Sequence, residues 1–240
     1  MYFQPQYYSE TGKLRGAEAL LRWPDPEGTG FITSPGEFIP IAEKNGAILP
    51  IGNYVIKEAL KTFNDWRTKY HIPMILSINI SAVQLEKENF VDNMSHVLSM
   101  YGVNAESIEL EITESVFINN FEDVIDKIKT LRGLGMRVSL DDFGTGYSSL
   151  SYLRQLPIDT IKIDRSFIDN ALKDDSSSII YESVIKMSQK LGFETVAEGV
   201  ETKEQFNYLR ERNIDIVQGY LLGKPISKVE FEKMLIRQIP

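Results

Sequence analysis

Short apolar or β-branched runs alternate with longer segments of helical periodicity along most of the chain. Runs of four to seven such residues, bounded by polar or glycine-containing segments, predict buried strands. The eight runs of this kind are residues 2–6, 17–23, 74–80, 108–113, 137–140, 160–163, 194–197 and 216–220. Apolar residues three and four apart predict helices between several of them, at residues 54–68, 121–134, 179–191 and 203–212.

This alternation favours a (β/α)8 TIM-like barrel, with an open doubly wound sheet as the alternative. Only about ten residues, 7–16, separate the first two predicted strands, and a parallel crossover needs a dozen or more. We therefore expect the first strand to pair antiparallel with the second. The sequence contains neither a long Gly/Ser/Pro linker nor a repeated block, so residues 1–240 are interpreted as a single domain.

Nearly every predicted strand ends at or near a residue that can bind a metal ion or a substrate. In barrels of this class the carboxyl ends of the strands converge on one mouth, where catalytic groups lie. A single acid at a strand end is more often a helix cap or a solvated group, but a succession of them favours a site. The residues are Gln4, Glu18 with Arg22, Asn79, Glu111, Asp141 with Asp142, Lys162 with Asp164, Glu198, and Gln218.

Six carboxylates gathered in one mouth would repel one another strongly. Each close pair costs roughly 4 kcal/mol at about 4 Å and an effective dielectric constant of about 20. Lys162 and Arg22 cannot neutralise six charges, so either some carboxylates are protonated or divalent cations are bound. The sequence has no cysteine, and His71 and His96 fall outside the strand ends. An all-oxygen ligand set favours Mg²⁺ or Mn²⁺ over zinc.

Composition narrows the classes of function further. The absence of cysteine excludes disulfides, iron–sulfur clusters and a thiol nucleophile. A net charge of -8 argues against binding to a nucleic-acid polymer, because phosphate backbones are held by clusters of lysine and arginine. Neither an apolar run of 18 residues nor a secretory signal is present. We expect a cytoplasmic domain, although a longer protein containing it could still be membrane-anchored.

At these residues the chain resembles the EAL family of bacterial cyclic di-GMP phosphodiesterases. The eponymous tripeptide is Glu18-Ala19-Leu20, followed by Leu21-Arg22-Trp23. The similarity runs from Tyr2 to Pro225 and is highly specific as an ordered set. Its other segments are residues 77–81 (SINIS), 110–115 (LEITES), 141–149 (DDFGTGYSS), 161–167 (IKIDRSF), 197–202 (AEGVET) and 218–220 (QGY).

The resemblance implies a barrel with one antiparallel strand and two Mg²⁺ or Mn²⁺ ions per active site. It assigns one ion to Glu18, Asn79, Glu111 and Asp141, and the second to Asp141, Asp142 and Glu198. Lys162 would orient the attacking water, with Gln218 beside it and Glu198 also catalytic, while Glu114 would anchor the loop at residues 142–149. The residues expected to hold the dinucleotide are Gln4, Leu20, Arg22, Asp164 and Pro225.

The reaction implied is in-line attack of a metal-activated water on phosphorus, which opens cyclic di-GMP to linear pGpG. Every metal position, Lys162 and Glu114 are filled, so we expect an active enzyme rather than a relative that has become a receptor. We also expect the chain to be an excised output domain, with an upstream sensor or cyclase domain in the full-length protein. The family often pairs near residues 147–156, which predicts a homodimer.

Three other functions remain open from the sequence. A binding-only receptor for cyclic di-GMP would bind the ligand without turnover. A barrel glycosidase would use two carboxylates as acid and nucleophile, but it has no obvious use for Asn79 or Lys162. Its activity would be retained after chelation of metal ions. Only the family resemblance argues against a metal phosphodiesterase that acts on another nucleotide.

Overall fold

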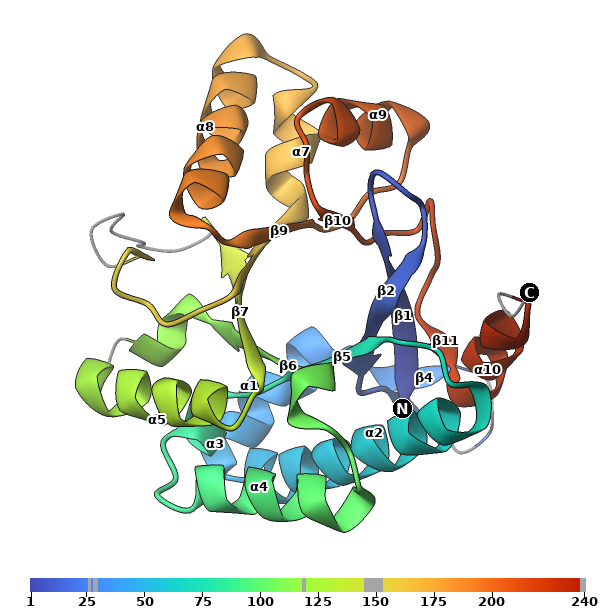
Figure 1. Cartoon of the computed structure of the whole chain (residues 1–240), viewed down its shortest axis with the longest axis vertical. Helices are drawn as coiled ribbons and strands as arrows, with labels where there is room; N and C mark the ends of the chain where they lie inside the picture. Colours follow the sequence, from blue (N-terminus) through green and yellow to red (C-terminus); the bar gives the residue numbers. More distant parts are fainter. Residues whose placement is uncertain (26, 28–29, 118–119, 145–152, 238–240) are drawn as a thin grey trace.

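The computed structural model describes residues 1–25, 27, 30–117, 120–144 and 153–237. Within these ranges, eight strands close into one barrel, and helices surround it (Figure 1). The barrel strands are β1 (Tyr2–Tyr8), β2 (Leu14–Leu20), β5 (Ile75–Asn79), β6 (Ile108–Thr113), β7 (Arg137–Phe143), β8 (Thr160–Ile163), β9 (Glu194–Ala197) and β10 (Ile216–Val217). All eight predicted strands are confirmed, with ends shifted by a few residues.

The first strand closes the barrel. β1 pairs antiparallel with β2, placing Gln4 opposite Glu18. On its other edge it pairs antiparallel with β10, placing Tyr8 opposite Ile216. The remaining neighbouring strands run parallel. The predicted antiparallel first strand is therefore confirmed, and the open doubly wound alternative is wrong.

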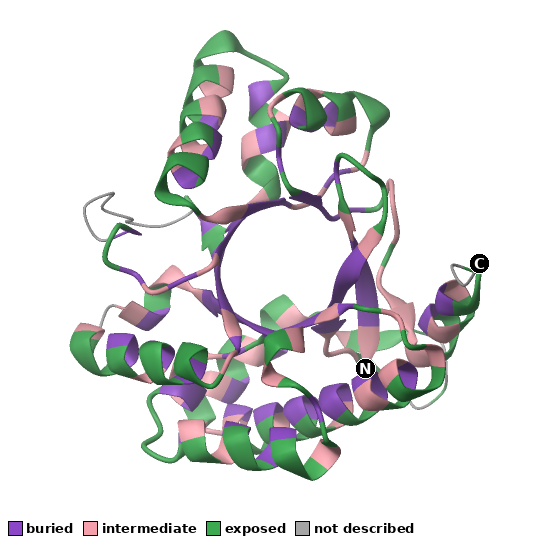
Figure 2. Cartoon of the chain, in the orientation of Figure 1, coloured by how far each residue is buried: buried purple, intermediate pink, exposed green. Residues whose placement is uncertain are grey.

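The helices lie outside the barrel with their apolar faces on its wall, so the strands are buried and the outer helix faces exposed (Figure 2). The four predicted helices correspond to α2, α5, α8 and α9. No helix in the described part of the chain is both long and apolar enough to cross a membrane. The α-helices are α1 (Pro35–Asn45), α2 (Ile48–Tyr70), α3 (Ala82–Leu85), α4 (Phe90–Tyr101), α5 (Phe121–Gly133), α7 (Arg165–Ala171), α8 (Asp175–Leu191), α9 (Lys203–Glu211) and α10 (Lys228–Ile236), and the 3₁₀ helices are η1 (Ala105–Ser107) and η2 (Glu114–Phe117).

Three short strands were not predicted. β3 (Trp23–Pro24) and β4 (Phe31–Thr33) form a separate hairpin, so the predicted second strand, 17–23, ends three residues early. β11 (Ile226–Ser227) pairs with the beginning of β1. Because Tyr2 lies between Leu20 and Ser227, this pairing brings the segment after Pro225 to the end of the barrel where β2 ends.

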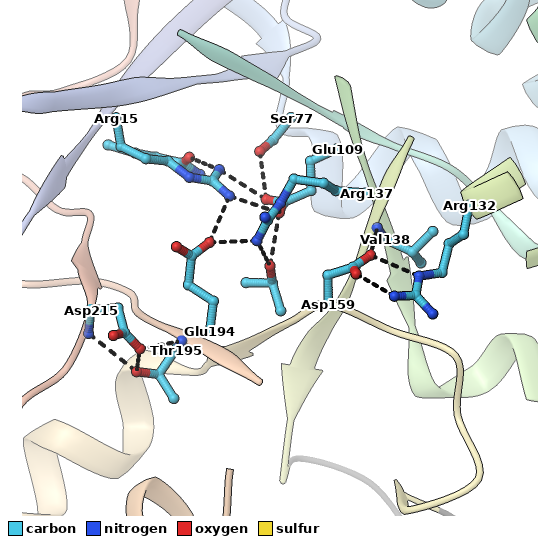
Figure 3. A network of polar contacts seen from close by, with 12 residues as sticks. Arg15, Ser77, Glu109, Arg132, Arg137, Val138, Asp159, Glu194, Thr195 and Asp215 are labelled. Carbon is cyan, nitrogen blue, oxygen red and sulfur yellow. Dashed lines mark hydrogen bonds and ion pairs between the residues drawn. The ribbon is translucent and has the colours of Figure 1, made fainter. Parts of the chain in front are cut away.

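Buried and half-buried charges lie at the opposite end of the barrel, where the parallel strands begin. Arg15 and Glu109 form a bidentate pair, with Nη1–Oε1 at 2.9 Å and Nη2–Oε2 at 2.7 Å. Arg137 contacts both Glu109, at 3.2 Å, and Glu194, at 2.6 Å (Figure 3). We call Arg15, Glu109, Arg137 and Glu194 the base network. Two guanidinium groups balance two carboxylates there, which is the condition for burying charge at tolerable cost.

Candidate active site

Carboxylates from four parts of the barrel surround the ammonium of Lys162 on β8. The side chain of Lys162 is 1% exposed, so these contacts lie deep in the barrel. The distances from its Nζ are 2.7 Å to Glu111 Oε2, 2.8 Å to Glu198 Oε1, 3.1 Å to Asp141 Oδ1 and 3.8 Å to Glu18 Oε2. The predicted convergence of strand-end acids on Lys162 is thus present in the structure.

The Glu18 carboxylate is held from both sides by amides. Asn79 Nδ2 donates to Oε1 at 2.7 Å, and Gln218 Nε2 donates to Oε2 at 2.6 Å. Gln218 Nε2 also lies 3.2 Å from Gln4 Oε1, while Gln4 Nε2 donates to the carbonyl oxygen of Gly223 at 3.1 Å. These contacts fix the direction of the Glu18 oxygens.

Asp141 and Asp142 both belong to the acidic cluster, although consecutive side chains of a regular strand point to opposite faces. The β7–β8 register shifts between Leu140 and Phe143, and Asp142 has φ 55°. A left-handed conformation is uncommon for a residue other than glycine and often marks a functional site. As a result, Asp141, Asp142 and Glu198 offer ligand atoms within 4.8 Å of one another.

The site carries more negative charge than Lys162 can compensate. Burial and then the neighbouring Glu18 raise the pKa of Glu111 well above its ordinary value. Burial, opposed by Lys162 but reinforced by Asp141, raises the pKa of Glu198 to about 8. Burial also disfavours the charge of Glu18, but Lys162, Gln218 and Asn79 outweigh it and lower the Glu18 pKa.

A divalent cation fits this cluster. Glu111 Oε1 is buried and has no hydrogen-bond partner among the described residues, and a buried acceptor left unpaired is costly. The surrounding donor set is entirely oxygen, which suits a hard cation. An acidic group able to hold a metal ion is therefore present at the carboxyl ends of the strands.

Glu114 holds the start of the loop after β7. Its Oε1 accepts a hydrogen bond from the backbone N–H of Gly144 at 3.0 Å. Gly144 has φ 94°, and a Cβ there would lie 2.3 Å from the ring of Phe167. Glycine is therefore required at this position. Glu114 thus contacts Gly144 of the loop that it is expected to anchor, and residues 145–149 of that loop lie outside the described residues.

The remaining predicted residues lie around the rim. Leu20 ends β2, and Arg22 follows it, half-buried, with Nη1 donating to the carbonyl oxygen of Leu21 at 3.0 Å. Pro225 immediately precedes β11 at the same end of the barrel. Asp164 caps α7 by accepting from the N–H of Ser166 at 2.9 Å. The pKa of Asp142 is raised by burial, then by the charge of Asp141, and then by the charge of Asp164.

Comparison with known proteins places this geometry in context. The EAL domain family model matches residues 1–225. The chain is 39% identical over 241 residues to the oxygen sensor protein DosP of Escherichia coli K12, covering 100% of this chain and 30% of that protein. It is 37% identical over 237 residues to the cyclic di-GMP phosphodiesterase PA2567 of Pseudomonas aeruginosa, covering 99% of this chain and 40% of that protein.

A solved structure described as the PaMucR phosphodiesterase in complex with c-di-GMP has the same fold. It superposes with a TM-score of 0.90 at 36% identity, covering 96% of this chain and 92% of that one. The family model spans nearly the whole chain, and the fold and sequence similarities extend over the same residues. The chain therefore belongs to the EAL domain family.

Proposed function

We propose that this chain is a metal-dependent phosphodiesterase that hydrolyses cyclic di-GMP to linear pGpG. The observation that carries the proposal is the ring of Glu18, Glu111, Asp141 and Glu198 around Lys162 at the carboxyl ends of the strands. The family relatives support the choice of substrate, since PA2567 is named a cyclic di-GMP phosphodiesterase and the PaMucR structure is a c-di-GMP complex.

Two groups of residues would hold the cations. Asp141, Asp142 and Glu198 already present oxygens within 4.8 Å of one another. The other group consists of Glu18, Asn79 and Glu111, with Asp141 shared between the two. The unpaired Oε1 of Glu111 supports its assignment as a ligand. Mg²⁺ and Mn²⁺ both suit these oxygens.

Bound cations would lower the pKa of a coordinated water and stabilise negative charge on the phosphoryl oxygens. The protein supplies the positioning. Lys162 Nζ carries three donors and lies between the two groups of ligands, so it would be placed to orient the attacking water once cations compete for these carboxylates. Gln218 and Asn79 keep the oxygens of Glu18 directed, and Arg22 is placed at the rim to meet a phosphate.

The product follows from the symmetry of the substrate. Cyclic di-GMP contains two equivalent phosphodiester bonds, so addition of one water across either bond opens the ring. The expected product is the linear dinucleotide pGpG with a terminal phosphate. Gln4, Leu20, Asp164 and Pro225 are proposed to contact the dinucleotide, because they lie at the end of the barrel that contains the acidic cluster.

The experiment is chromatography of cyclic di-GMP after incubation with the purified protein in Mg²⁺, in Mn²⁺, and after chelation. We expect pGpG in the first two samples and unchanged substrate in the third. Glu18→Gln is the test variant, and Glu211→Gln, whose side chain is 76% exposed, is the matched control. Unchanged substrate in every sample, with binding confirmed by calorimetry, would establish a receptor instead.

We further propose that the chain is the output domain of a longer protein. It spans 30% and 40% of the two curated relatives described above, which supports this proposal. The expected homodimer involves residues 147–156, of which 147–152 lie outside the described residues. Sedimentation velocity of the isolated chain tests it, with a single monomeric species at micromolar concentration as the contradicting result.

A further inference from the structure

A line of hydrogen bonds connects the base network to the acidic site through the barrel interior. Arg15 Nη1 donates to Gln6 Oε1 at 2.8 Å, and Gln6 Nε2 donates to Gln218 Oε1 at 2.9 Å. Gln218 Nε2 then donates to Glu18 Oε2 at 2.6 Å. We call Arg15, Gln6, Gln218 and Glu18 the amide relay.

The direction of the relay is fixed by the chemistry of its two ends. A guanidinium group can only donate hydrogen bonds, and a carboxylate can only accept them. Arg15 therefore requires the oxygen of the Gln6 amide, which leaves the NH₂ of Gln6 facing Gln218. Glu18 likewise requires the NH₂ of Gln218. Arg15 and Glu18 therefore set the two amide orientations. These orientations are compatible, because the NH₂ of Gln6 faces the oxygen of Gln218.

Because Gln6 and Gln218 are both buried, the orientation of their side-chain amides decides whether their polar atoms find partners. Gln6 is 0% exposed and Gln218 is 3% exposed, so bulk water is poorly placed to replace a missing partner. If Gln218 turned over, its oxygen would face the Glu18 carboxylate, and two acceptors would oppose each other. The NH₂ of Gln6 stabilises the observed orientation of Gln218. It donates to the Gln218 oxygen, which leaves the Gln218 NH₂ facing Glu18.

We propose that Gln6 is a positioning residue for the active site: it holds Gln218 in the orientation that donates to Glu18. This inference rests on the proposed function, in which Glu18 is a metal ligand. Gln6 lies two residues after Gln4 on β1 and contacts Gln218 and Arg15, so it acts through Gln218. Residues that orient metal ligands commonly change metal affinity or activity by about 10- to 100-fold when replaced.

The test variant is Gln6→Met, which keeps the length of the side chain and removes both hydrogen bonds. We expect kcat to fall by about tenfold or more and the KM for cyclic di-GMP to change less than kcat. We also expect Mn²⁺ binding to weaken, which is measured by the electron paramagnetic resonance signal of free Mn²⁺. Thr160→Val is the matched control, because Thr160 is buried, bonds Glu109 at 2.8 Å and lies outside the relay.

The comparison separates positioning from general destabilisation. If the role of Gln6 were merely structural, Gln6→Met would lose activity only in proportion to lost stability, as is expected of Thr160→Val. That result would overturn the proposal. In a Gln218→Met background, Gln6→Met should have no further effect on Mn²⁺ binding. Additive effects would mean that Gln6 does not act through Gln218.

A further measurement needs neither a variant nor turnover. With ¹⁵N-labelled glutamine, the side-chain NH₂ groups of Gln6 and Gln218 in the wild-type chain should exchange with deuterium slowly. Fast exchange at Gln6 would overturn the relay. If the wild-type chain fails to hydrolyse cyclic di-GMP while both amides exchange slowly and Gln6→Met weakens Mn²⁺ binding, the proposed substrate fails and the relay stands.

Discussion

The ammonium nitrogen of Lys162 lies 2.7 Å from Oε2 of Glu111, and both side chains are almost completely buried. Carboxylates of Asp141 and Glu198 lie at 3.1 and 2.8 Å from the same nitrogen. Lys162 therefore offsets part of the negative charge of the acidic site and, in the proposed mechanism, orients the attacking water. Its removal should affect both stability and chemistry.

We expect Lys162→Met to reduce turnover by about 10²- to 10⁴-fold, the usual contribution of a residue that positions or transfers a proton. Without added cations the variant should also be less stable, because removing one partner of a buried ion pair costs about 3–5 kcal/mol. Initial rates and urea unfolding measure the two effects. Lys186→Met, on a side chain that is 68% exposed, is the control, and wild-type turnover in a folded Lys162→Met protein would exclude the assigned role.

Cations should stabilise the folded chain by an amount that grows with the logarithm of their concentration above the Kd. The acidic cluster is assembled by the fold, and a ligand that binds only the folded state adds about 2.7 kcal/mol at a concentration 100 times its Kd. We therefore expect Mn²⁺ to raise the midpoint of thermal unfolding and chelation to reverse the increase. Asp141→Asn should lose most of the shift. An equal shift in the two proteins would place the bound ion elsewhere.

Acid should break the base network only at a lower pH than most surface ion pairs, because the carboxylate of Glu109 resists protonation. Burial disfavours the charge of Glu109, but Arg15 and Arg137 outweigh it and lower its pKa from 4.5 to about 2. A lowered pKa in the folded state means that this stabilisation is complete above about pH 4.5 and is lost as the pH falls towards 2. The difference corresponds to about 3 kcal/mol.

Urea unfolding at a series of pH values from 7 to 2 measures this loss. Glu109→Gln provides the control, because it removes the titrating group, although the variant starts less stable with Arg15 partly unpaired. The free energy of unfolding of the wild type should fall more steeply than that of the variant below about pH 4.5. Parallel profiles would show that Glu109 does not carry the effect.

Gly16→Ala should destabilise the barrel severely. A Cβ at Gly16 would lie 1.9 Å from the carbonyl oxygen of Ile75, where β2 and β5 pair. That oxygen belongs to the backbone, so the strands themselves must separate. We expect a loss of more than about 3 kcal/mol, as for other severe core overpacking.

Gly133→Ala is the matched control for this substitution. Gly133 is the last residue of α5, and a Cβ there would meet nothing within 4 Å. Alanine should leave stability unchanged or raise it by up to about 1 kcal/mol, because it reduces the freedom of the unfolded chain. Similar losses at both positions would mean that close strand approach is not the cause.

Much of the fold and the centre of the site could be predicted because they depend on local patterns. Each barrel strand is a compact apolar run, and Glu18, Glu111 and Lys162 stand where parallel strands direct side chains into one mouth. The short first connection fixed the direction of β1 because a chain of about ten residues cannot cross a sheet. These inferences need no knowledge of distant contacts.

Other features depend on contacts that no local pattern records. Both Asp141 and Asp142 were expected in the mouth from the strand-end pattern and the family resemblance, but regular strand periodicity does not explain how both reach it. A left-handed Asp142 and a register shift bring both into the cluster. The base network was also missed, since charged residues are usually exposed. A signal existed for Glu109 and Gln6, which lie two residues from Glu111 and Gln4 and therefore share their strand faces.

The double pairing of β1 also sets an order of assembly. Tyr7 and Tyr8 pair with Val217 and Ile216, so β1 gains its second barrel neighbour only after β10, the last barrel strand in the sequence, has been made. The β1–β2 hairpin can form early from local contacts, but ring closure must bring together strands separated by almost the full sequence and is therefore slow. Until then one edge of β1 stays open to wrong partners. We expect closure of the ring at β10 to complete folding, and the amide relay from Gln6 to Gln218 to form in that same step.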